Sequence, residues 1–353
     1  MKKKSKAKGN KKSAGKARII ARIASLTLVL AVVFCCAVGD WFVHQPREWL
    51  EAHRAFYTAP LWYFGNRTAF ITDAFGWTGH DAVYDYDDPV PTNEVFFAGA
   101  PERVGDPAPK DIIVLRRGEF TIGWSPSLRH PVWAAYHVVK DARFDSLPRP
   151  NFQKDRSVDS SPSPDDYAHS GYQRGHLVPN RAIVTRYGPD EQAKTFRMTN
   201  IAPQLRALNC GPWRELEQRI ADLWTARYGE IWVIVGTISP VAERKNLGTA
   251  PIDVPTQFYM LIAAVEPKAE RQNEEEPAAE VRALAVILPQ TADISDFPVH
   301  GIVTINELEV ATGFHFFPDM PKFLAKPLKA DRPTRLWPIR LRDIFKLILT
   351  RFT

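Results

Sequence analysis

Seven short runs of apolar, β-branched and aromatic residues constrain the fold of this chain more than any other feature. Each run has the length and composition typical of a β-strand, and the last three read as buried strands. They cover residues 94–98, 111–115, 120–124, 132–139, 231–236, 258–263 and 283–288. Because helical patterns are few between them, the sequence predicts an α+β fold with a largely antiparallel central sheet and flanking helices.

Two helices are predicted among these strands. Between Asn209 and Tyr228, apolar residues recur at helical spacing and form one apolar face, and Asn209 is a suitable N-cap. The second helix is predicted from Ile305 to Thr312, because Gly313 is a typical residue after a helix C-terminus.

The positive charge of the chain is concentrated at its N-terminus. Ten of the 46 Lys and Arg residues lie within the first 22 positions, and no acidic residue precedes Asp40. The other 36 basic residues face 40 acidic ones, so the remainder has a net charge of −4. The overall charge of +6 is therefore no sign that the folded part binds nucleic acid, and such a function needs a local basic site.

The basic tail is followed by an apolar stretch that carries no charge between Ile23 and Val38. Counted over residues 19–43, the stretch is long enough to span a bilayer, and the preceding Lys and Arg residues predict that the N-terminus stays in the cytoplasm. We expect a signal-anchor, that is, a transmembrane helix, with the rest of the chain extracytoplasmic (periplasmic or extracellular). A cleaved signal peptide, which would give a secreted protein, is the alternative.

The expected organisation has five parts. A basic cytoplasmic tail (1–18) and the transmembrane or signal segment (19–43) precede a juxtamembrane linker (44–92), whose end, Asp81–Pro91, is acidic and closes with Pro-Val-Pro. The main domain covers residues 93–325. The tail 326–353 is predicted to contain a basic amphipathic helix between Leu336 and Thr353, which either lies on the membrane surface or packs on the domain.

Candidate catalytic residues gather in three blocks, at 171–182, 196–204 and 208–217. The first contains Arg174-Gly175-His176, and a neutral imidazole at physiological pH suits His176 as a general base. Gly175 allows backbone geometry that a residue with a side chain would resist. The side-chain oxygen of Asn209 is a ligand that a hard cation such as Mg²⁺ accepts.

Glu217 follows Asn209 by eight residues. On one continuous helix this spacing separates them by roughly 12 Å along the axis and about 80° around it, so both can face one cavity without gripping the same ion. Glu217 therefore suits a role that holds a metal-bound water. A nucleophilic Cys210 paired with His176 is the competing interpretation of the segment, although no third orienting residue is evident.

In order and spacing, the three blocks resemble the DNA/RNA non-specific endonucleases, the endonuclease G–like members of the ββα-metal nucleases. Weaker matches extend the resemblance to roughly residues 93–322; they are Pro131–Tyr136, Arg149–Phe152, Val233–Pro240 and Thr312–Phe317. This family usually has Asp-Arg-Gly-His, whereas Gln173 stands here in place of the acid. Gln can still supply an oxygen to a hydrogen bond but not a negative charge.

The resemblance implies a ββα-metal active site with a role for each residue. Asn209 would be the only direct protein ligand of Mg²⁺, with Mn²⁺ or Ca²⁺ as alternatives, and water would fill the other positions. His176 would be the base and Glu217 would order a metal-bound water. Arg149 and Arg174 would contact the scissile phosphate, unless Arg174 supports the turn. Gln204 would contribute to substrate binding and, with Asn200, would shape the site.

The sequence thus predicts a membrane-anchored, metal-dependent endonuclease that hydrolyses DNA and RNA without sequence preference, because its contacts go to phosphates. The resemblance implies products with a 5′-phosphate and a 3′-hydroxyl. The alternatives are a catalytically weak or inactive nucleic-acid-binding module of the same fold, and a hydrolase of smaller phosphodiesters. The oligomeric state stays open, with a homodimer among the options.

Overall fold

The computed structural model describes residues 80–86, 92–93, 95–145, 147–240, 242, 244–267, 279–293 and 296–339, together with Trp41, Gln45 and Trp49. The chain divides into two compact units, Met1–Thr72 and Asp73–Thr353, and the fold described below belongs to the second. The predicted tail 1–18 and, apart from Trp41, the segment 19–43 lie outside the described residues. Among the residues described, no helix is both long enough and apolar enough to cross a membrane.

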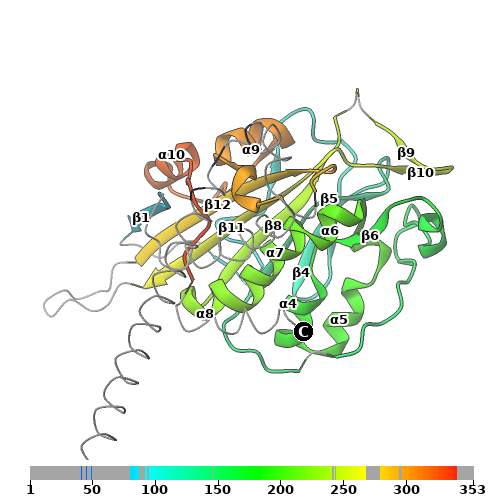
Figure 1. The fold of residues 1–353 in the computed structure, drawn as a ribbon, viewed down its shortest axis with the longest axis horizontal. Coiled ribbons are helices and arrows are strands. Elements are labelled where there is room, and N and C mark those ends of the chain that lie inside the picture. Colours follow the sequence, from blue (N-terminus) through cyan, green and yellow to red (C-terminus); the bar gives the residue numbers. More distant parts are fainter. Residues whose placement is uncertain are drawn as a thin grey trace, which may run out of the picture. The chain divides into compact units, whose positions relative to one another are not determined.

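An eight-stranded sheet forms the centre of the second unit (Figure 1). Its strand order is β1-β12-β11-β8-β5-β4-β3, with β13 paired to β12, and all of these pairings are antiparallel. This confirms the predicted α+β fold with an antiparallel central sheet. The strands are Ala82–Tyr86 (β1), Ile113–Arg116 (β3), Phe120–Ser125 (β4), His130–Val138 (β5), Ile231–Ile238 (β8), Gln257–Pro267 (β11), Ala279–Pro289 (β12) and Ile302–Val303 (β13).

The central strands β4, β5 and β8 are buried along their whole length. This burial explains why they appear in the sequence as continuous apolar runs rather than as alternating ones. Two glycines make room for large rings: a Cβ at Gly123 would lie 2.2 Å from the Trp133 ring, and one at Gly236 would lie 2.6 Å from the Tyr259 ring. The packing of these two rings therefore requires glycine, which has no side chain, at both positions.

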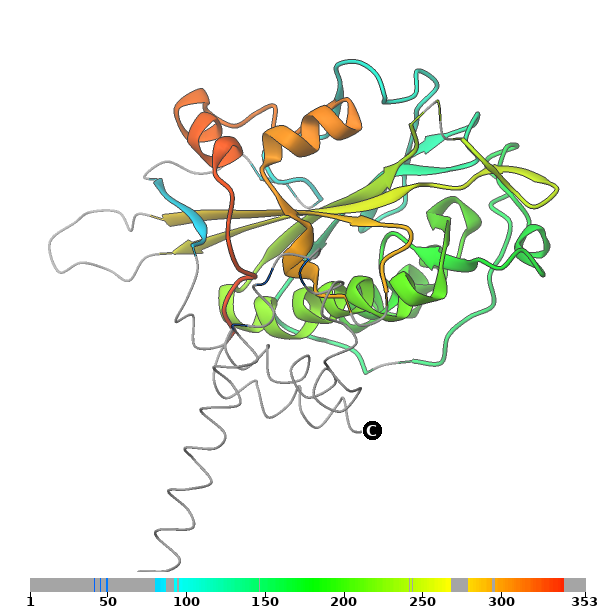
Figure 2. The same ribbon diagram turned by 45° about the horizontal axis from the view of Figure 1, so that its top comes forward.

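Helices cover both faces of the sheet. In Figure 2 the sheet is seen nearly edge-on, with α9 (Ile305–Thr312) and α10 (Lys322–Ala330) on one face and the helical region from α4 to α8 on the other. The prediction of α9 is confirmed: Thr304 and Glu307 form a capping box, and Gly313 ends the helix at φ 71°. The helical region contains Asn180–Tyr187 (α4), Pro189–Thr195 (α5), Arg206–Cys210 (α6), Pro212–Gln218 (α7), the π-helical turn Arg219–Trp224, and Thr225–Tyr228 (α8).

Smaller elements complete the described fold. Three two-stranded antiparallel sheets pair Glu102–Arg103 (β2) with Phe314–His315 (β14), Gln173–His176 (β6) with Ile201–Gln204 (β7), and Asn246–Leu247 (β9) with Ala250–Asp253 (β10). Short 3₁₀ turns occupy Pro164–Tyr167, Met198–Asn200 and Pro298–Gly301.

The helix predicted to begin at Asn209 is wrong at its start. Asn209 lies inside α6, and the chain breaks at Gly211 before α7 begins with Pro212. Proline lacks an N–H and suits the first position of a helix, so Pro212 ends one helix and begins another. The apolar face is as expected, since Trp213 and Leu216 are fully buried. Asn209 and Glu217 are consequently on two helices, and the spacing expected on one helix does not apply to them.

The folded unit begins earlier than predicted. Within the expected linker 81–91, β1 pairs with β12 at the edge of the sheet. Asp81, just before this strand, accepts a hydrogen bond of 2.9 Å from Arg335 Nε. An acidic segment thus forms a strand because distant residues pair with it. By contrast, the described part of the run 94–98 forms only an isolated bridge between Thr92 and Phe97.

The domain also extends beyond residue 325. Leu336, Trp337 and Ile339 are buried, and the Trp224 indole N–H donates to the Trp337 carbonyl at 2.9 Å. The start of the predicted amphipathic tail therefore packs on the domain. Residues 340–353, where a membrane-surface helix was the other expectation, lie outside the described residues.

Candidate active site

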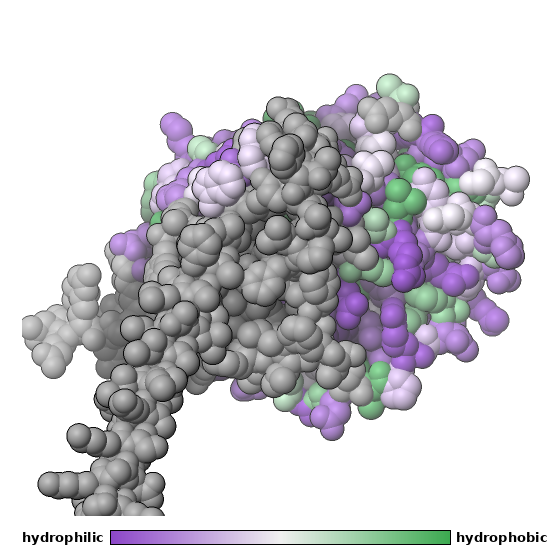
Figure 3. Space-filling view, in the orientation of Figure 1, coloured by the Kyte–Doolittle hydropathy of each residue, from purple (hydrophilic) through white to green (hydrophobic). Residues whose placement is uncertain are grey.

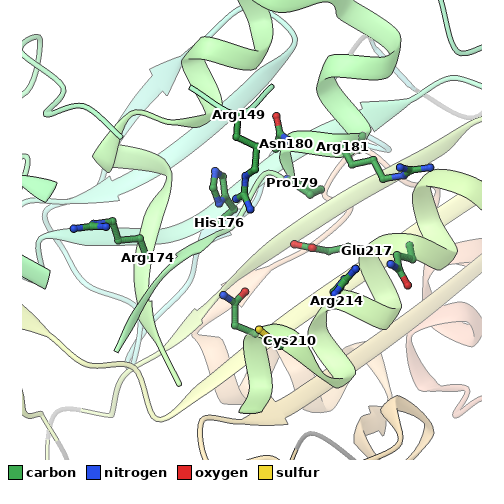
Figure 4. Close-up of a pocket in the computed structure, with 12 residues that line it drawn as sticks. Arg149, Arg174, His176, Pro179, Asn180, Arg181, Cys210, Arg214 and Glu217 are labelled. Atoms are coloured by element: carbon green, nitrogen blue, oxygen red, sulfur yellow. The ribbon is translucent and has the colours of Figure 1, made fainter. Parts of the chain in front are cut away.

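The two strands β6 and β7 and the helices α6 and α7 form a ββα arrangement beside the main sheet. Antiparallel pairing sets His176 opposite Ile201, and α6 begins two residues after β7 ends. Between them lies a pocket of about 430 Å³ (Figure 4). In the space-filling view, hydrophilic side chains surround a hollow between α5 and α6 (Figure 3). The pocket is lined by Arg149, Arg174, His176, Pro179, Asn180, Arg181, Ala182, Asn209, Cys210, Arg214, Glu217 and Gln218.

Five of the six predicted catalytic, metal or substrate residues line this pocket: Arg149, Arg174, His176, Asn209 and Glu217. The sixth, Gln204, is fully buried and does not line it.

Gln204 and Asn200 instead support the residues around His176. A Cβ at Gly175 would lie 2.4 Å from Gln204 Oε1, so glycine is needed here for close approach and not, as predicted, for unusual backbone geometry. The Asn200 amide accepts from Val178 N at 2.9 Å and donates to Val178 O at 3.0 Å. Asn200 thereby holds the chain that follows His176.

The His176 imidazole is packed between two aromatic rings. Its centroid is 5.3 Å from that of Phe152 and 4.8 Å from that of Phe196. Among the described residues Nε2 has no hydrogen-bond partner and is enclosed, whereas Nδ1 is not enclosed in this way. Burial, and then the charge of Arg149, lowers the pKa of His176 to about 3. The imidazole is therefore neutral at physiological pH, which a proton acceptor requires.

The Asn209 amide is oriented by the residue that departs from the family pattern. Asn209 Nδ2 donates to Gln173 Oε1 at 2.7 Å, so its own Oδ1 stays available on the pocket side. The Cys210 thiol lies 3.7 Å from the same Gln173 oxygen. Gln173 thus supplies the oxygen that an acid would supply, without its charge. Since the thiol is directed at Gln173, the geometry favours the metal interpretation of this segment over a Cys210 nucleophile.

Glu217 is a half-buried carboxyl in cationic surroundings. Burial raises its pKa to about 8, with smaller opposing effects from Trp213, Arg149 and Arg214. Within the described part of the chain, no Lys or Arg lies at ion-pair distance from it. A desolvated carboxylate without a counter-ion is stabilised by a cation placed near it.

The donors in the pocket fit a hard divalent cation that keeps most of its water. Asn209 Oδ1 and the Glu217 carboxylate are oxygen donors, which Mg²⁺ prefers. Over the residues described, the structure contains no group of three His, Cys, Asp or Glu side chains able to hold a metal. The described residues of this pocket therefore do not offer the ligand set of a soft or tightly caged metal, whereas their oxygen donors suit a largely hydrated Mg²⁺.

The two predicted phosphate-binding arginines differ in their surroundings. Arg149 Cζ lies 5.5 Å from the centre of the Phe196 ring, beside His176. Arg174 Nη2 instead donates to the Pro164 carbonyl at 2.7 Å, and its side chain points away from the other labelled residues (Figure 4). Arg174 therefore supports the loop before β6, as one of its two predicted roles required, and Arg149 is the arginine placed beside the candidate base.

Comparison with known proteins identifies the family. The sequence pattern of the DNA/RNA non-specific endonucleases matches residues 98–323. The chain belongs to this family. Relatives include the mitochondrial nuclease EXOG of Mus musculus, 28% identical over 221 residues that cover 57% of this chain and 56% of that protein. The mitochondrial endonuclease G of Bos taurus is 25% identical over 222 residues, covering 58% of this chain and 69% of that protein.

The chain spans little more than half the length of the EXOG relatives that it matches. A solved structure has a similar fold: a chain of the crystal structure of the EndoG/EndoGI complex, which concerns the mechanism of EndoG inhibition. It has 21% sequence identity and a TM-score of 0.50, and covers 59% of this chain and 87% of that chain.

In this member of the DNA/RNA non-specific endonuclease family, further polar residues line the pocket that the sequence did not single out: Asn180, Arg181, Arg214 and Gln218. Asn180 and Arg181 lie in the first sequence block, 171–182, and Arg214 lies in the third, 208–217, whereas Gln218 lies just beyond it. Arg181 Nε lies 3.0 Å from Asp222 Oδ2, a contact that only the fold creates. Together these residues make the pocket positive, although the chain beyond its first 22 residues has a net charge of −4.

Proposed function

We propose that this chain is a metal-dependent, sequence-non-specific endonuclease that hydrolyses phosphodiester bonds of DNA and RNA. The observation that carries the proposal is one pocket that joins a neutral His176, an Asn209 amide oriented by Gln173, and the cationic group of Arg149. Membership of the non-specific endonuclease family supports it.

In the proposed reaction, Nδ1 of His176 accepts a proton from the water that attacks phosphorus. The P–O3′ bond then breaks, so the phosphate stays on the 5′ end and the leaving 3′ oxygen takes a proton from water. Arg149 contacts the phosphate and stabilises its charge in the transition state. Because the phosphate offsets the charge of Arg149, it also raises the pKa of His176 towards the range in which a base works best.

We assign the cation to Asn209 Oδ1, with Glu217 holding one of its waters and Gln173 fixing the amide. Mg²⁺ fits this donor set, and Mn²⁺ or Ca²⁺ are alternatives. When bound, such a cation would stabilise negative charge on the oxygens at phosphorus. The Gln204 side chain packs against the backbone of Gly175 and is not proposed as a contact to substrate.

The test is digestion of supercoiled plasmid by the purified full-length chain, with Mg²⁺, Mn²⁺ or Ca²⁺ and with EDTA. We expect nicking and then degradation with Mg²⁺, and a loss on the order of 10³-fold in EDTA, because several kcal/mol of transition-state stabilisation depend on the cation. RNA should be degraded under the same conditions, and ends should carry 5′-phosphate. Undiminished digestion in EDTA would contradict the proposal.

A nucleic-acid-binding module that cuts weakly or not at all is the second candidate. Two observations favour it: Gln173 brings no negative charge, and the pKa of His176 is low for a base in the free pocket. Such a protein would retain a labelled oligonucleotide but leave it intact at every divalent-cation concentration. Turnover of a small chromogenic diester without plasmid nicking would instead indicate a hydrolase of smaller phosphodiesters.

We also propose that residues 19–43 anchor the chain in a membrane with the nuclease domain extracytoplasmic, or direct its secretion if they are cleaved. The proposal rests on the uncharged run from Ile23 to Val38 and on the basic residues before it. The oligomeric state, including a homodimer, is not assigned. A reporter fused to the N-terminus should remain on the cytoplasmic side; its appearance on the other side would overturn the proposed orientation.

A further inference from the structure

A second hollow, which shares no lining residue with the candidate active site, is strongly basic. It has a volume of about 350 Å³ and is formed by the β3–β4 turn, the segment around Asp155 and the end of α5. We call it the basic pocket. Its lining residues are Arg116, Arg117, Gly118, Asp155, Arg156, Ser157, Lys194 and Arg197. Five of these eight residues are cationic and one is acidic.

Two of the five cations are neutralised by acids of the fold. Arg117 Nη2 lies 2.6 Å from Asp155 Oδ2, and Lys194 pairs with Glu191. Asp155 is 4% exposed and also accepts from Thr199 Oγ1 at 2.8 Å, so it holds the Arg117 guanidinium in a fixed position. The turn is tightly packed, since a Cβ at Gly118 would meet Glu191 at 2.7 Å. The pocket therefore has a preorganised floor.

The other three cations supply the excess positive charge. Arg116 and Arg156 are exposed and Arg197 is half-buried. Within the part of the chain that the structure describes, none of the three has an ion-pair partner. Three uncompensated guanidinium groups around a hollow form a site for a polyanion, because guanidinium binds phosphate oxygens through two parallel hydrogen bonds.

The basic pocket and the candidate active site lie on neighbouring residues of the same two segments. Phe196, whose ring contacts His176, is followed directly by Arg197 of the basic pocket. Gln153 N donates to Phe196 O at 3.0 Å, and Met198 N donates to Gln153 O at 2.9 Å. Backbone hydrogen bonds thus join the segment around Gln153 to the segment 196–198.

The separation of the two pockets suits one nucleic-acid strand. Arg149 lines one and Arg156 the other. Six residues lie between them, and the seven Cα–Cα steps limit their Cα separation to about 25 Å. At 3.4 Å per nucleotide, about seven nucleotides of a strand in helical form span this distance.

We propose that the basic pocket binds backbone phosphates of the nucleic-acid strand up to about seven nucleotides from the bond that is cut. The inference rests on the proposed function for the kind of substrate, but not on the chemistry of cleavage. Such contacts position the strand and carry no sequence information, which agrees with cleavage without sequence preference. They also make affinity depend on strand length and salt, because each phosphate contact releases a counterion.

The test compares two full-length variants with equal net charge. The first changes Arg116, Arg156 and Arg197 to Gln. The matched control changes three exposed lysines that line neither pocket, Lys110, Lys322 and Lys326, to Gln. Binding of labelled single-stranded DNA of 4 and 20 nucleotides is measured in EDTA by fluorescence anisotropy over a range of salt concentrations.

For the 20-mer, we expect the first variant to bind at least about tenfold more weakly than the control, with a salt slope smaller by about 2, since each single-strand phosphate contact contributes about 0.7. The difference between the two variants should be smaller for the 4-mer, because a short strand offers fewer phosphates for contact with the basic pocket. Equal 20-mer affinities and salt slopes in the two variants would overturn the proposal.

Two further measurements separate the possible failures. Hydrolysis of bis(p-nitrophenyl) phosphate with Mg²⁺ should be unchanged in the first variant; if neither the parent nor the variants hydrolyse it or cut plasmid, the proposed function fails while the binding result still stands. Vesicles containing anionic phosphatidylglycerol test the other source of phosphate. Loss of vesicle binding in the first variant, with unchanged 20-mer binding, would assign the basic pocket to a membrane surface and overturn the inference.

Discussion

His176→Ala is expected to reduce plasmid cleavage by about 10²–10⁴-fold, the range that a positioned general base contributes. Among the described residues that line the pocket, His176 is the neutral candidate base, since burial and Arg149 lower its pKa to about 3. Initial rates of supercoiled-plasmid nicking with saturating Mg²⁺ measure the effect. His315→Ala is the matched control, because His315 lies outside the pocket and should keep the parent rate.

The shortened side chain leaves space between Phe152 and Phe196, so loss of activity alone does not separate chemistry from folding. Two measurements separate them. Thermal denaturation shows whether the variant folds, and added imidazole should restore part of the rate if the missing group is a proton acceptor. A folded His176→Ala protein that cuts plasmid at the parent rate would contradict the assignment.

Glu217→Gln is expected to stabilise the metal-free protein at alkaline pH, while it weakens catalysis. Burial raises the pKa of Glu217 from its ordinary value of 4.5 to about 8, so the folded state keeps the proton more tightly than the unfolded state. The protonated carboxyl costs little below pH 4.5. As the pH rises from 4.5 through 8, the free energy of unfolding of the parent falls, because the unfolded chain ionises more easily.

The glutamine variant has no proton to lose and should escape this fall. Because Glu217 is half-buried and water screens it, we expect the parent to lose on the order of 1–3 kcal/mol more than the variant between pH 5 and pH 9. Urea unfolding in EDTA at the two pH values measures the difference. Glu102→Gln, at an exposed position, should follow the parent.

The same unfolding experiment with Mg²⁺ in place of EDTA tests whether a cation binds near Glu217. A cation bound near Glu217 should stabilise the parent at pH 8 and leave the Gln variant less affected, since a ligand stabilises only the state that binds it.

The pH series in EDTA can contradict the prediction. A variant that loses stability with pH as steeply as the parent would show that Glu217 is ionised in the folded pocket, and would remove the electrostatic reason for placing a cation there.

The central strands and α9 could be predicted from sequence because local residues decide them. The runs that became β4, β5, β8, β11 and β12 are apolar along their length, as strands covered on both faces must be. The capping residues Thr304 and Glu307 and the positive φ at Gly313 act within one turn of α9. The end signals of α9 therefore need no distant contact.

Elements that depend on distant partners were missed. β1 lies in the acidic segment 81–91, which resembles a linker, and it forms a strand because β12 pairs with it and Arg335 pairs with Asp81. The Trp337 ring is buried against Trp224, 113 residues away, whose ring centroid lies 5.3 Å from its own and whose indole N–H donates to the Trp337 carbonyl. In both cases the stabilising contact comes from another part of the chain, which no local pattern records.

For the candidate site, the sequence by itself determined which groups are present: His176, Asn209 and Glu217 stand in motifs whose order and spacing are characteristic of the family. Only the tertiary structure decided their states and neighbours. It turned Arg174 to the Pro164 carbonyl, placed Gln204 beneath Gly175, and brought Arg214 to the pocket. The physical reason is that side-chain identity is a local property, whereas burial, charge environment and hydrogen-bond partner arise from segments that meet only in the folded chain.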